Sequence, residues 1–276
     1  MHGFLSRDGM APRQFAAVAQ AELARYPSVV FEPVEVLQAA AIREGFSVMA
    51  GARTVRARKV LIATGLRDRV PPIDGFETVF GSSVFQCPYC DGWEFRDRPL
   101  AAYGKRQRGL DMARALTAWS RDVVLCTDGA AGFSPQQLRE LAGNGIQLNE
   151  QRIQRLEHTG GSLRHVVFRD GTRLPRDALF FDTRSEGQSD LARQLGCTFN
   201  RQGGVLCGKY EATAAPGVYV AGNIIRNVQL SIIAAAEGAN AAFGINRALT
   251  REDYFNRASA MCGKGAALPL RRMPPR

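Results

Sequence analysis

The segment Lys59-Val60-Leu61-Ile62-Ala63-Thr64-Gly65 predicts a buried strand that ends on a tight turn. Glycine at such a turn lets the backbone approach a nucleotide closely. Residues 217–223, which read Gly-Val-Tyr-Val-Ala-Gly-Asn, repeat this pattern late in the chain. Residues 99–104 form a third apolar strand that ends in glycine, and an expected helix follows it. The pattern predicts an α/β fold with nucleotide-binding turns.

A cysteine pair lies between these strands, in the run Cys87-Pro88-Tyr89-Cys90, and Asp91 follows it directly. A CxxC pair at a helix start places two sulfurs close together and favours a thiolate. One thiol can attack a partner disulfide and the other can resolve it, while Asp91 acts as an acid or base. A zinc site would need a second Cys or His pair, and the three histidines and the other four cysteines show no such spacing. We therefore expect a redox centre and no metal, with an inert buried pair as the remaining alternative.

The composition narrows the function classes. The net charge of +10 could suit nucleic acid, but the arginines are scattered and no aromatic-interleaved basic stripe is present. A solvated, arginine-rich surface is the better interpretation, with no nucleic-acid partner. No apolar run approaches the roughly 18 residues of a membrane span, and the first residues lack the pattern of a signal peptide. We expect a cytoplasmic protein with no membrane contact.

Taken together, Ala63-Thr64-Gly65, the run Cys-Pro-Tyr-Cys-Asp-Gly-Trp-Glu from Cys87, and residues 217–223 with Gln229 resemble the low-molecular-weight thioredoxin reductase family. These are FAD- and NAD(P)-dependent pyridine nucleotide-disulfide oxidoreductases. The chain is especially similar to the bacterial branch with CPYC-type centres, which is related to dithiol oxidases. The resemblance covers about residues 1–250. It implies electron transfer from NADPH or NADH through FAD to the Cys87/Cys90 disulfide, and on to a thioredoxin-like protein or a small disulfide; a homodimer is a further family expectation.

The resemblance also assigns roles to residues. It makes Cys90 the flavin-facing thiol, Cys87 the interchange thiol that attacks the substrate, and Asp91 the acid. Asn223 falls where the family has aspartate; it retains hydrogen bonding but removes a charge. The positions that match FAD-binding residues of the family are Thr64, Gly65, Gly222, Asn223, Gln229 and Leu230.

The loop Gly104-Lys105-Arg106-Gln107-Arg108-Gly109 follows a predicted strand and precedes a helix, which is the context of a GxGxxG nucleotide turn. Arg106 replaces the middle glycine, so its side chain would obstruct close approach of a pyrophosphate. The basic side chains could instead attract phosphates, or form a solvated loop. Asp128, after the next strand, favours a ribose 2′-hydroxyl and hence NADH, whereas family habit favours NADPH. Gly104, Arg106, Gly109 and Asp128 are the candidate nicotinamide residues.

The domain organisation follows from the order of these motifs and the resemblance. We expect two Rossmann-like domains with three-layer ββα architecture, the FAD domain being discontinuous. Its parts are residues 1–79 and 205–250, residues 80–204 form the NAD(P) domain with the CxxC, and residues 251–276 form a basic, disordered tail. Compared with the family, the first β-α-β unit with its GxGxxG turn is missing, through either a late start codon or a truncated chain.

Two other functions remain open at this point. An FAD-dependent dithiol oxidase would run the electrons in the opposite direction, from a dithiol to oxygen, and the altered loop at Arg106 favours it. A catalytically degenerate homologue would keep the fold as a binding or redox-sensing module.

Overall fold

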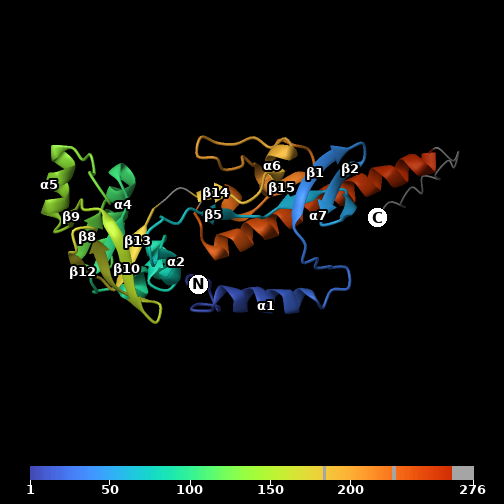
Figure 1. The fold of residues 1–276 in the computed structure, drawn as a ribbon. Helices are drawn as coiled ribbons and strands as arrows, with labels where there is room; N and C mark the ends of the chain where they lie inside the picture. The colour runs from blue at the N-terminus through green and yellow to red at the C-terminus, as the bar shows by residue number, and fades with distance from the viewer. Residues whose placement is uncertain (183–184, 226–227, 263–276) are drawn as a thin grey trace, which may run out of the picture. The chain divides into compact units, whose positions relative to one another are not determined.

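The computed structural model describes residues 1–182, 185–225 and 228–262, and Figure 1 shows their fold. The chain divides into two compact units. The first unit consists of Met1–Val29 and Arg67–Glu186, and the second consists of Val30–Leu66 and the described residues from Gly187 onward. Each contains parallel strands and helices, so the expected α/β class is confirmed.

The first unit is built on a five-stranded sheet in which every neighbouring pair is parallel. Its central strands are apolar and buried apart from the partly buried Tyr103, as expected for strands covered on both faces. In spatial order the strands are β6 (Val84–Phe85), β13 (Ala178–Phe181), β7 (Leu100–Tyr103), β8 (Val123–Cys126) and β9 (Gln147–Asn149).

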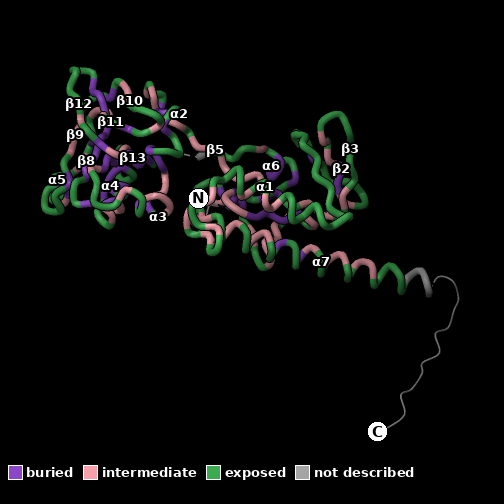
Figure 2. Tube along the Cα trace, turned by 90° about the horizontal axis from the view of Figure 1, so that it is seen from below, coloured by how far each residue is buried: buried purple, intermediate pink, exposed green. Residues whose placement is uncertain are grey.

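Successive strand residues point to opposite faces of this sheet and enter different cores. Leu100 packs in one core with residues of helices α4 (Arg106–Leu116) and α5 (Pro135–Gly143). Ala101 packs in the other core with residues of an antiparallel sheet. The unit is therefore a three-layer ββα structure, and Figure 2 shows buried residues along the sheet. The second sheet is β10 (Ile153–Thr159), β11 (Ser162–Phe168) and β12 (Arg173–Pro175), and helices α1 (Pro12–Leu23) and α2 (Phe76–Val79) also belong to this unit.

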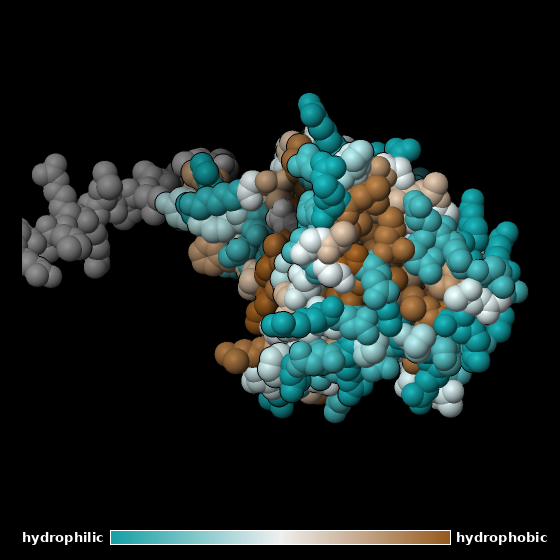
Figure 3. Space-filling model, turned by 90° about the vertical axis from the view of Figure 1, so that its left-hand side faces the viewer, coloured by the Kyte–Doolittle hydropathy of each residue, from teal (hydrophilic) through white to brown (hydrophobic). Residues whose placement is uncertain are grey.

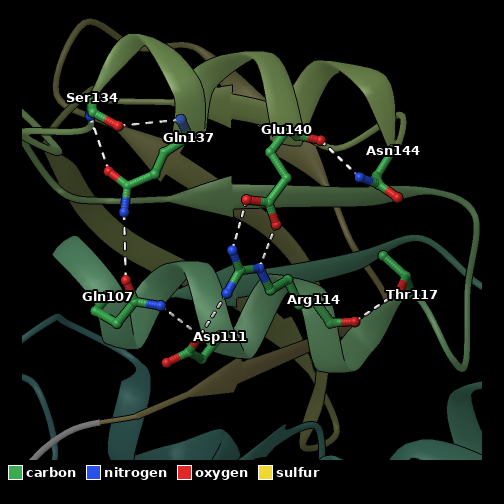
Figure 4. Close-up of polar contacts among 8 residues, drawn as sticks. All are labelled: Gln107, Asp111, Arg114, Thr117, Ser134, Gln137, Glu140 and Asn144. Carbon is green, nitrogen blue, oxygen red and sulfur yellow. Dashed lines mark hydrogen bonds and ion pairs between the residues drawn. The ribbon is translucent and has the colours of Figure 1, made fainter.

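Polar contacts hold α4 and α5 together on the surface (Figure 4). The Arg114 guanidinium donates to both oxygens of Glu140, over 2.5 and 2.6 Å. Ser134 caps α5 in a capping box with Gln137. The Gln137 amide also reaches Gln107 of α4 at 3.4 Å. These contacts fix the helix that starts at the candidate nucleotide loop.

The second unit has a short parallel pair, β4 (Val60–Ile62) and β15 (Val218–Val220). An antiparallel meander of β1 (Val36–Ile42), β2 (Gly45–Ala50) and β3 (Arg53–Ala57) shares a core with it. The long helix α7 (Ser231–Cys262) contacts β15. The other elements are helix α6 (Leu191–Gln194), the 3₁₀ turns η2 (Lys209–Glu211) and η3 (Gly222–Ile225), and the linking strands β5 (Leu66–Asp68) and β14 (Ser185–Gly187).

The observed boundaries differ from the expected ones at residues 79, 204 and 250. Phe76 and Val79 belong to the core of the first unit, so that unit begins before residue 80. Residues 187–204 belong to the second unit, because Leu191 and Leu195 pack against Val220. The segment 1–29 belongs to the first unit. These core contacts, rather than the positions of the motifs, set the division.

The expected tail at 251–276 is wrong over residues 251–262, because α7 continues through them. The Arg58 side chain pairs with Glu252 and with Asp253, and Lys59 also pairs with Glu252. These ion pairs hold this part of the helix to Arg58 and Lys59, just before β4. Residues 263–276 lie outside the described part of the chain.

Of the helices described, none is long and apolar enough to cross a membrane. On the face that Figure 3 shows, hydrophilic side chains are spread around a central hydrophobic patch.

Candidate active site

The redox turn, residues 87–91, follows β6 and includes the short helix α3 (Pro88–Asp91). Cys87 is the N-cap of α3, and its carbonyl accepts hydrogen bonds from the amides of Cys90 (3.1 Å) and Asp91 (3.2 Å). This turn brings the two cysteines together, with Cα atoms 5.2 Å apart, and they form a disulfide. Both cysteines are half-buried and Tyr89 between them is exposed, so the disulfide lies within reach of a partner.

Asp91 is half-buried beside this disulfide. Burial raises the pKa of its carboxyl group, while the positive charges of His2 and the chain's amino terminus partly oppose the shift. His2 lies 3.6 Å from Glu94 and 3.3 Å from Asp8. The Asp91 carboxyl therefore keeps its proton to a higher pH than an exposed aspartic acid does, which suits it to protonate a departing thiolate.

The nucleotide turn, residues 104–109, connects β7 to α4. A Cβ added to Gly109 would lie 2.3 Å from the Gly104 oxygen, and one added to Gly104 would lie 2.9 Å from the Gly109 Cα. Only glycine fits at either position. Arg106 has φ of 51°, the left-handed conformation that glycine adopts most easily. The backbone thus has the form expected at the middle position of a glycine turn, although the residue there carries a long basic side chain.

A hollow of about 500 Å³ lies over this turn, lined by residues 103–108 and Asp182. Arg108 donates to Asp182 at 3.3 Å. Burial raises the pKa of the Asp182 carboxyl group. Burial also raises the pKa of the Tyr103 hydroxyl group to about 12. Lys105, Arg106 and Arg108 make the hollow basic, with one cation already paired to a carboxylate.

Asp128 follows β8, as the sequence predicts, but has a structural partner. One of its carboxylate oxygens accepts the Ile153 amide at 2.8 Å, and the other lies 4.0 Å from Arg152. This bond joins β8 to the start of β10. A ribose contact stays a prediction.

The redox turn and the nucleotide turn lie at the same edge of the first unit's sheet. Strands β6 and β7 flank β13 on opposite sides and run parallel to it, so all three carboxyl ends meet there. Helices α3 and α4 are in contact. Asp182, the residue after β13, belongs to the same edge. The fold therefore brings the disulfide next to the basic hollow.

The flavin turns predicted in the second unit also share one edge. Strands β4 and β15 pair in parallel, so Thr64-Gly65 and Gly222-Asn223 leave the same side of the sheet. The Thr64 hydroxyl oxygen is buried, with no hydrogen-bond partner among the described residues. Gly65 and Gly222 have φ of 69° and 79°, and no atom of the described residues lies within 4 Å of a Cβ added to Gly65. An unsatisfied hydroxyl beside open glycine backbone fits a bound nucleotide cofactor at this edge.

Comparison with known proteins identifies the family. The model of the pyridine nucleotide-disulphide oxidoreductase family matches residues 28–238. The chain belongs to this family. A putative thioredoxin reductase TrxB from Bacillus anthracis is 32% identical, with a TM-score of 0.86 over 91% of this chain and 85% of that one. The crystal structure of HlmI is 31% identical, with a TM-score of 0.90 over 96% and 85% of the two chains.

Curated relatives agree. A probable thioredoxin reductase from Arthroderma benhamiae is 26% identical over 81% of this chain and 63% of its own length. The chain thus spans less than two thirds of that relative. A thioredoxin reductase from Mycolicibacterium smegmatis is 28% identical over 75% of this chain. The resemblance to low-molecular-weight thioredoxin reductases is confirmed, and pyridine nucleotide-disulphide oxidoreductases use a flavin and a nicotinamide nucleotide.

Glu237 contacts the predicted flavin turn, although no motif in the sequence indicated this contact. Its carboxylate accepts the Gly222 amide at 2.7 Å, from the second turn of α7. The only signal in the sequence was an acidic residue that follows an alanine run. The predicted Gln229 is exposed, and the Leu230 amide donates to Val228, so that amide is already satisfied.

Proposed function

We propose that the protein is a flavin-dependent disulfide oxidoreductase of the thioredoxin reductase type. It would use NADPH or NADH and FAD to reduce the Cys87–Cys90 disulfide, and would pass the reducing equivalents to a thioredoxin-like protein or a small disulfide. The observation that carries the proposal is the disulfide beside the half-buried Asp91, at the same sheet edge as the basic hollow.

The cysteines perform the exchange with the substrate. When bound, FAD would supply the electron pair that opens the disulfide. Cys87 is the proposed interchange thiol, and its thiolate attacks the substrate disulfide to form a mixed disulfide. Cys90 then attacks the Cys87 sulfur, which restores the Cys87–Cys90 bond and releases the reduced substrate.

Asp91 handles the proton in this exchange. Because burial keeps its carboxyl group protonated to a higher pH, Asp91 can donate a proton to the departing thiolate. Its place immediately after Cys90, in the helix that also holds both sulfurs, fits that role.

The residues assigned to cofactors belong to the two glycine-rich edges. Thr64, Gly65, Gly222 and Asn223 would hold FAD, with Glu237 orienting the Gly222 turn and Gln229 and Leu230 at the start of α7. Gly104, Arg106, Gly109 and Asp128 would hold the nicotinamide nucleotide, with Gly104 and Gly109 needed for packing in either case. We assign the protein to the cytoplasm, where the thiols of Cys126, Cys197 and Cys207 would stay reduced. A homodimer is the proposed assembly.

A dithiol oxidase is the second candidate, and the nucleotide turn favours it. Arg106 takes the place of the middle glycine, Arg108 is paired with Asp182, and Asp128 is bound to Ile153. In that reaction FAD would accept electrons from a dithiol through the same cysteines and pass them to oxygen.

The test is the visible spectrum of the purified full chain, followed by anaerobic addition of NADH, NADPH or a dithiol. Bleaching of a yellow protein by a nicotinamide nucleotide supports the reductase. Reduction by dithiols alone, with oxygen consumed on re-aeration, supports the oxidase. A colourless chain that does not take up added FAD would contradict both and leave the degenerate homologue.

A further inference from the structure

A second pair of cysteines lies opposite each other in the second unit. Residues 198–206 form an antiparallel hairpin in which Phe199 pairs with Val205. The Leu206 amide donates to Thr198 and the Asn200 amide donates to Gly204, both over 2.9 Å. These bonds lie on either side of Phe199 and Val205, which marks them as a non-hydrogen-bonded pair. Cys197 precedes Thr198 and Cys207 follows Leu206, so the two cysteines lie side by side at the open end of this hairpin.

Cysteines at the open end of a hairpin lie next to a directly opposed pair, whose Cα atoms are about 4.5–5.5 Å apart. Disulfides span Cα separations of roughly 4.4–6.8 Å. Cys197 and Cys207 are therefore placed within reach of a disulfide.

The side chains of the two cysteines pack in the same part of the second unit. Cys197, Val205, Phe199 and Cys207 all pack in the same hydrophobic core. Cys197 is buried, whereas Cys207 is partly exposed. One thiol is thus reachable from solvent and the other lies behind it.

Thr213 connects the two cysteines independently of the hairpin register. Its backbone pairs with Cys207 in an isolated antiparallel bridge. Its side chain lies close enough to the Cys197 thiol to lower the pKa of that thiol. The two thiols are therefore neighbours of one residue.

We propose that Cys197 and Cys207 form a second redox-active thiol pair, which low-molecular-weight disulfides oxidise reversibly to a disulfide. The Cys207 thiol loses its proton and attacks a small disulfide RSSR, giving a Cys207–SR mixed disulfide and one RSH. The Cys197 thiol then attacks the Cys207 sulfur and releases the second RSH. Two protein thiols are oxidised, one small disulfide is reduced, and the proton of each protein thiol ends on an RSH.

Burial and nearby carboxylates favour the protonated form of these thiols. Burial raises the pKa of both thiols, and Glu211 and Glu237 raise that of Cys207 further. Glu237 is also the residue that holds the Gly222 amide, and the Val205 amide donates to Ile224 of η3. The pair therefore shares its core with η3, which begins at the predicted flavin turn.

The test treats the native full chain with oxidised glutathione, then blocks free thiols and digests with trypsin. Cleavage after Arg193, Arg201 and Lys209 puts Cys197 and Cys207 on separate peptides, 194–201 and 202–209. We expect these peptides to be recovered joined by a disulfide that dithiothreitol reverses. The buried Cys126 should remain a free thiol and serves as the internal control.

A matched variant separates the pair from a single reactive cysteine. In Cys197→Ser, Cys207 should accumulate as its glutathione adduct, because nothing resolves the mixed disulfide. If the wild-type chain instead keeps glutathione on Cys207, or both peptides stay free at glutathione concentrations that modify the variant, the proposal is wrong. Failure of Cys207 to react in both proteins would overturn it as well. Circular dichroism of the variant checks that it is folded.

Discussion

The redox turn and the nucleotide turn follow parallel strands on either side of β13, but only the redox turn has all the residues that its predicted chemistry needs. The redox turn has both sulfurs bonded and an acid beside them. The nucleotide turn has the two glycines that its backbone packing requires, but an arginine where a ligand would need close approach. The comparison teaches that packing and ligand binding make separate demands on a strand-turn-helix connection.

The largest effect should come from the redox turn. Replacing Cys87 or Cys90 with serine removes one partner of the disulfide, and disulfide turnover should fall by roughly three orders of magnitude or more. The flavin content should stay unchanged, since the predicted FAD residues lie in the second unit. Steady-state kinetics with a small disulfide and the visible spectrum measure the two quantities. Retention of turnover in both variants would remove the redox turn from the mechanism.

The acid of the redox turn should have the next largest effect. Asp91→Asn removes the proton donor, so turnover should fall about a hundredfold. In the wild type, turnover should decline as pH rises through the raised pKa of Asp91, and this limb should vanish in the variant. A raised carboxyl pKa disfavours the folded state at higher pH, so the amide should also leave the melting temperature unchanged or higher at neutral pH. An unchanged pH profile would assign the decline to another group.

The packing demand of the nucleotide turn is tested by Gly109→Ala. The new Cβ would lie 2.3 Å from the Gly104 oxygen, so the backbone must move, at a cost of about 1–3 kcal/mol of unfolding free energy. Gly143→Ala is the matched control, because a Cβ there meets no atom within 4 Å at the end of α5. Thermal unfolding of both variants should show a clear loss only for the first. Equal melting temperatures would show that the contact between the two glycines is easily relieved.

The ligand demand of the same turn is tested by Arg106→Gly, which should have the smallest effect. Removing the side chain while keeping the positive φ should tighten NADH or NADPH binding about tenfold, or about 1.4 kcal/mol. Arg106→Lys keeps a cation and serves as the control, with little change expected. Isothermal titration measures both. Weaker binding in the glycine variant would instead show that the guanidinium contacts the phosphates.

Local patterns in the sequence predicted much of the first unit. The apolar run at residues 178–181 forms β13, and the apolar run that ends at Cys126 forms the buried strand β8. The cysteine pair was placed at a helix start, which the structure confirms. Such features depend on residues close together in the chain, so periodicity and motif spacing suffice to find them.

Features that depend on distant partners were missed or misjudged. The β-rich run at residues 28–31 forms no strand, because Val30 and Phe31 stay exposed and pair with no described strand. Strand β12 has three residues and includes a proline, and is recognisable only by its pairing with β11. Asp128 bonds to an amide 25 residues later, and Glu237 to one 15 residues earlier. Neither bond follows from the local sequence.

Helix α7 has a mechanical consequence for the second unit. A parallel pair with three residues in each strand is too short to be stable by itself. Lys59, just before β4, is tied to Glu252, and Gly222, just after β15, is tied to Glu237. The helix thus binds opposite ends of the strand pair through Glu237 and Glu252, which lie about 22 Å apart along the helix axis. The helix therefore connects the two ends of the strand pair, and a displacement at one end is transmitted to the other through the rigid helix.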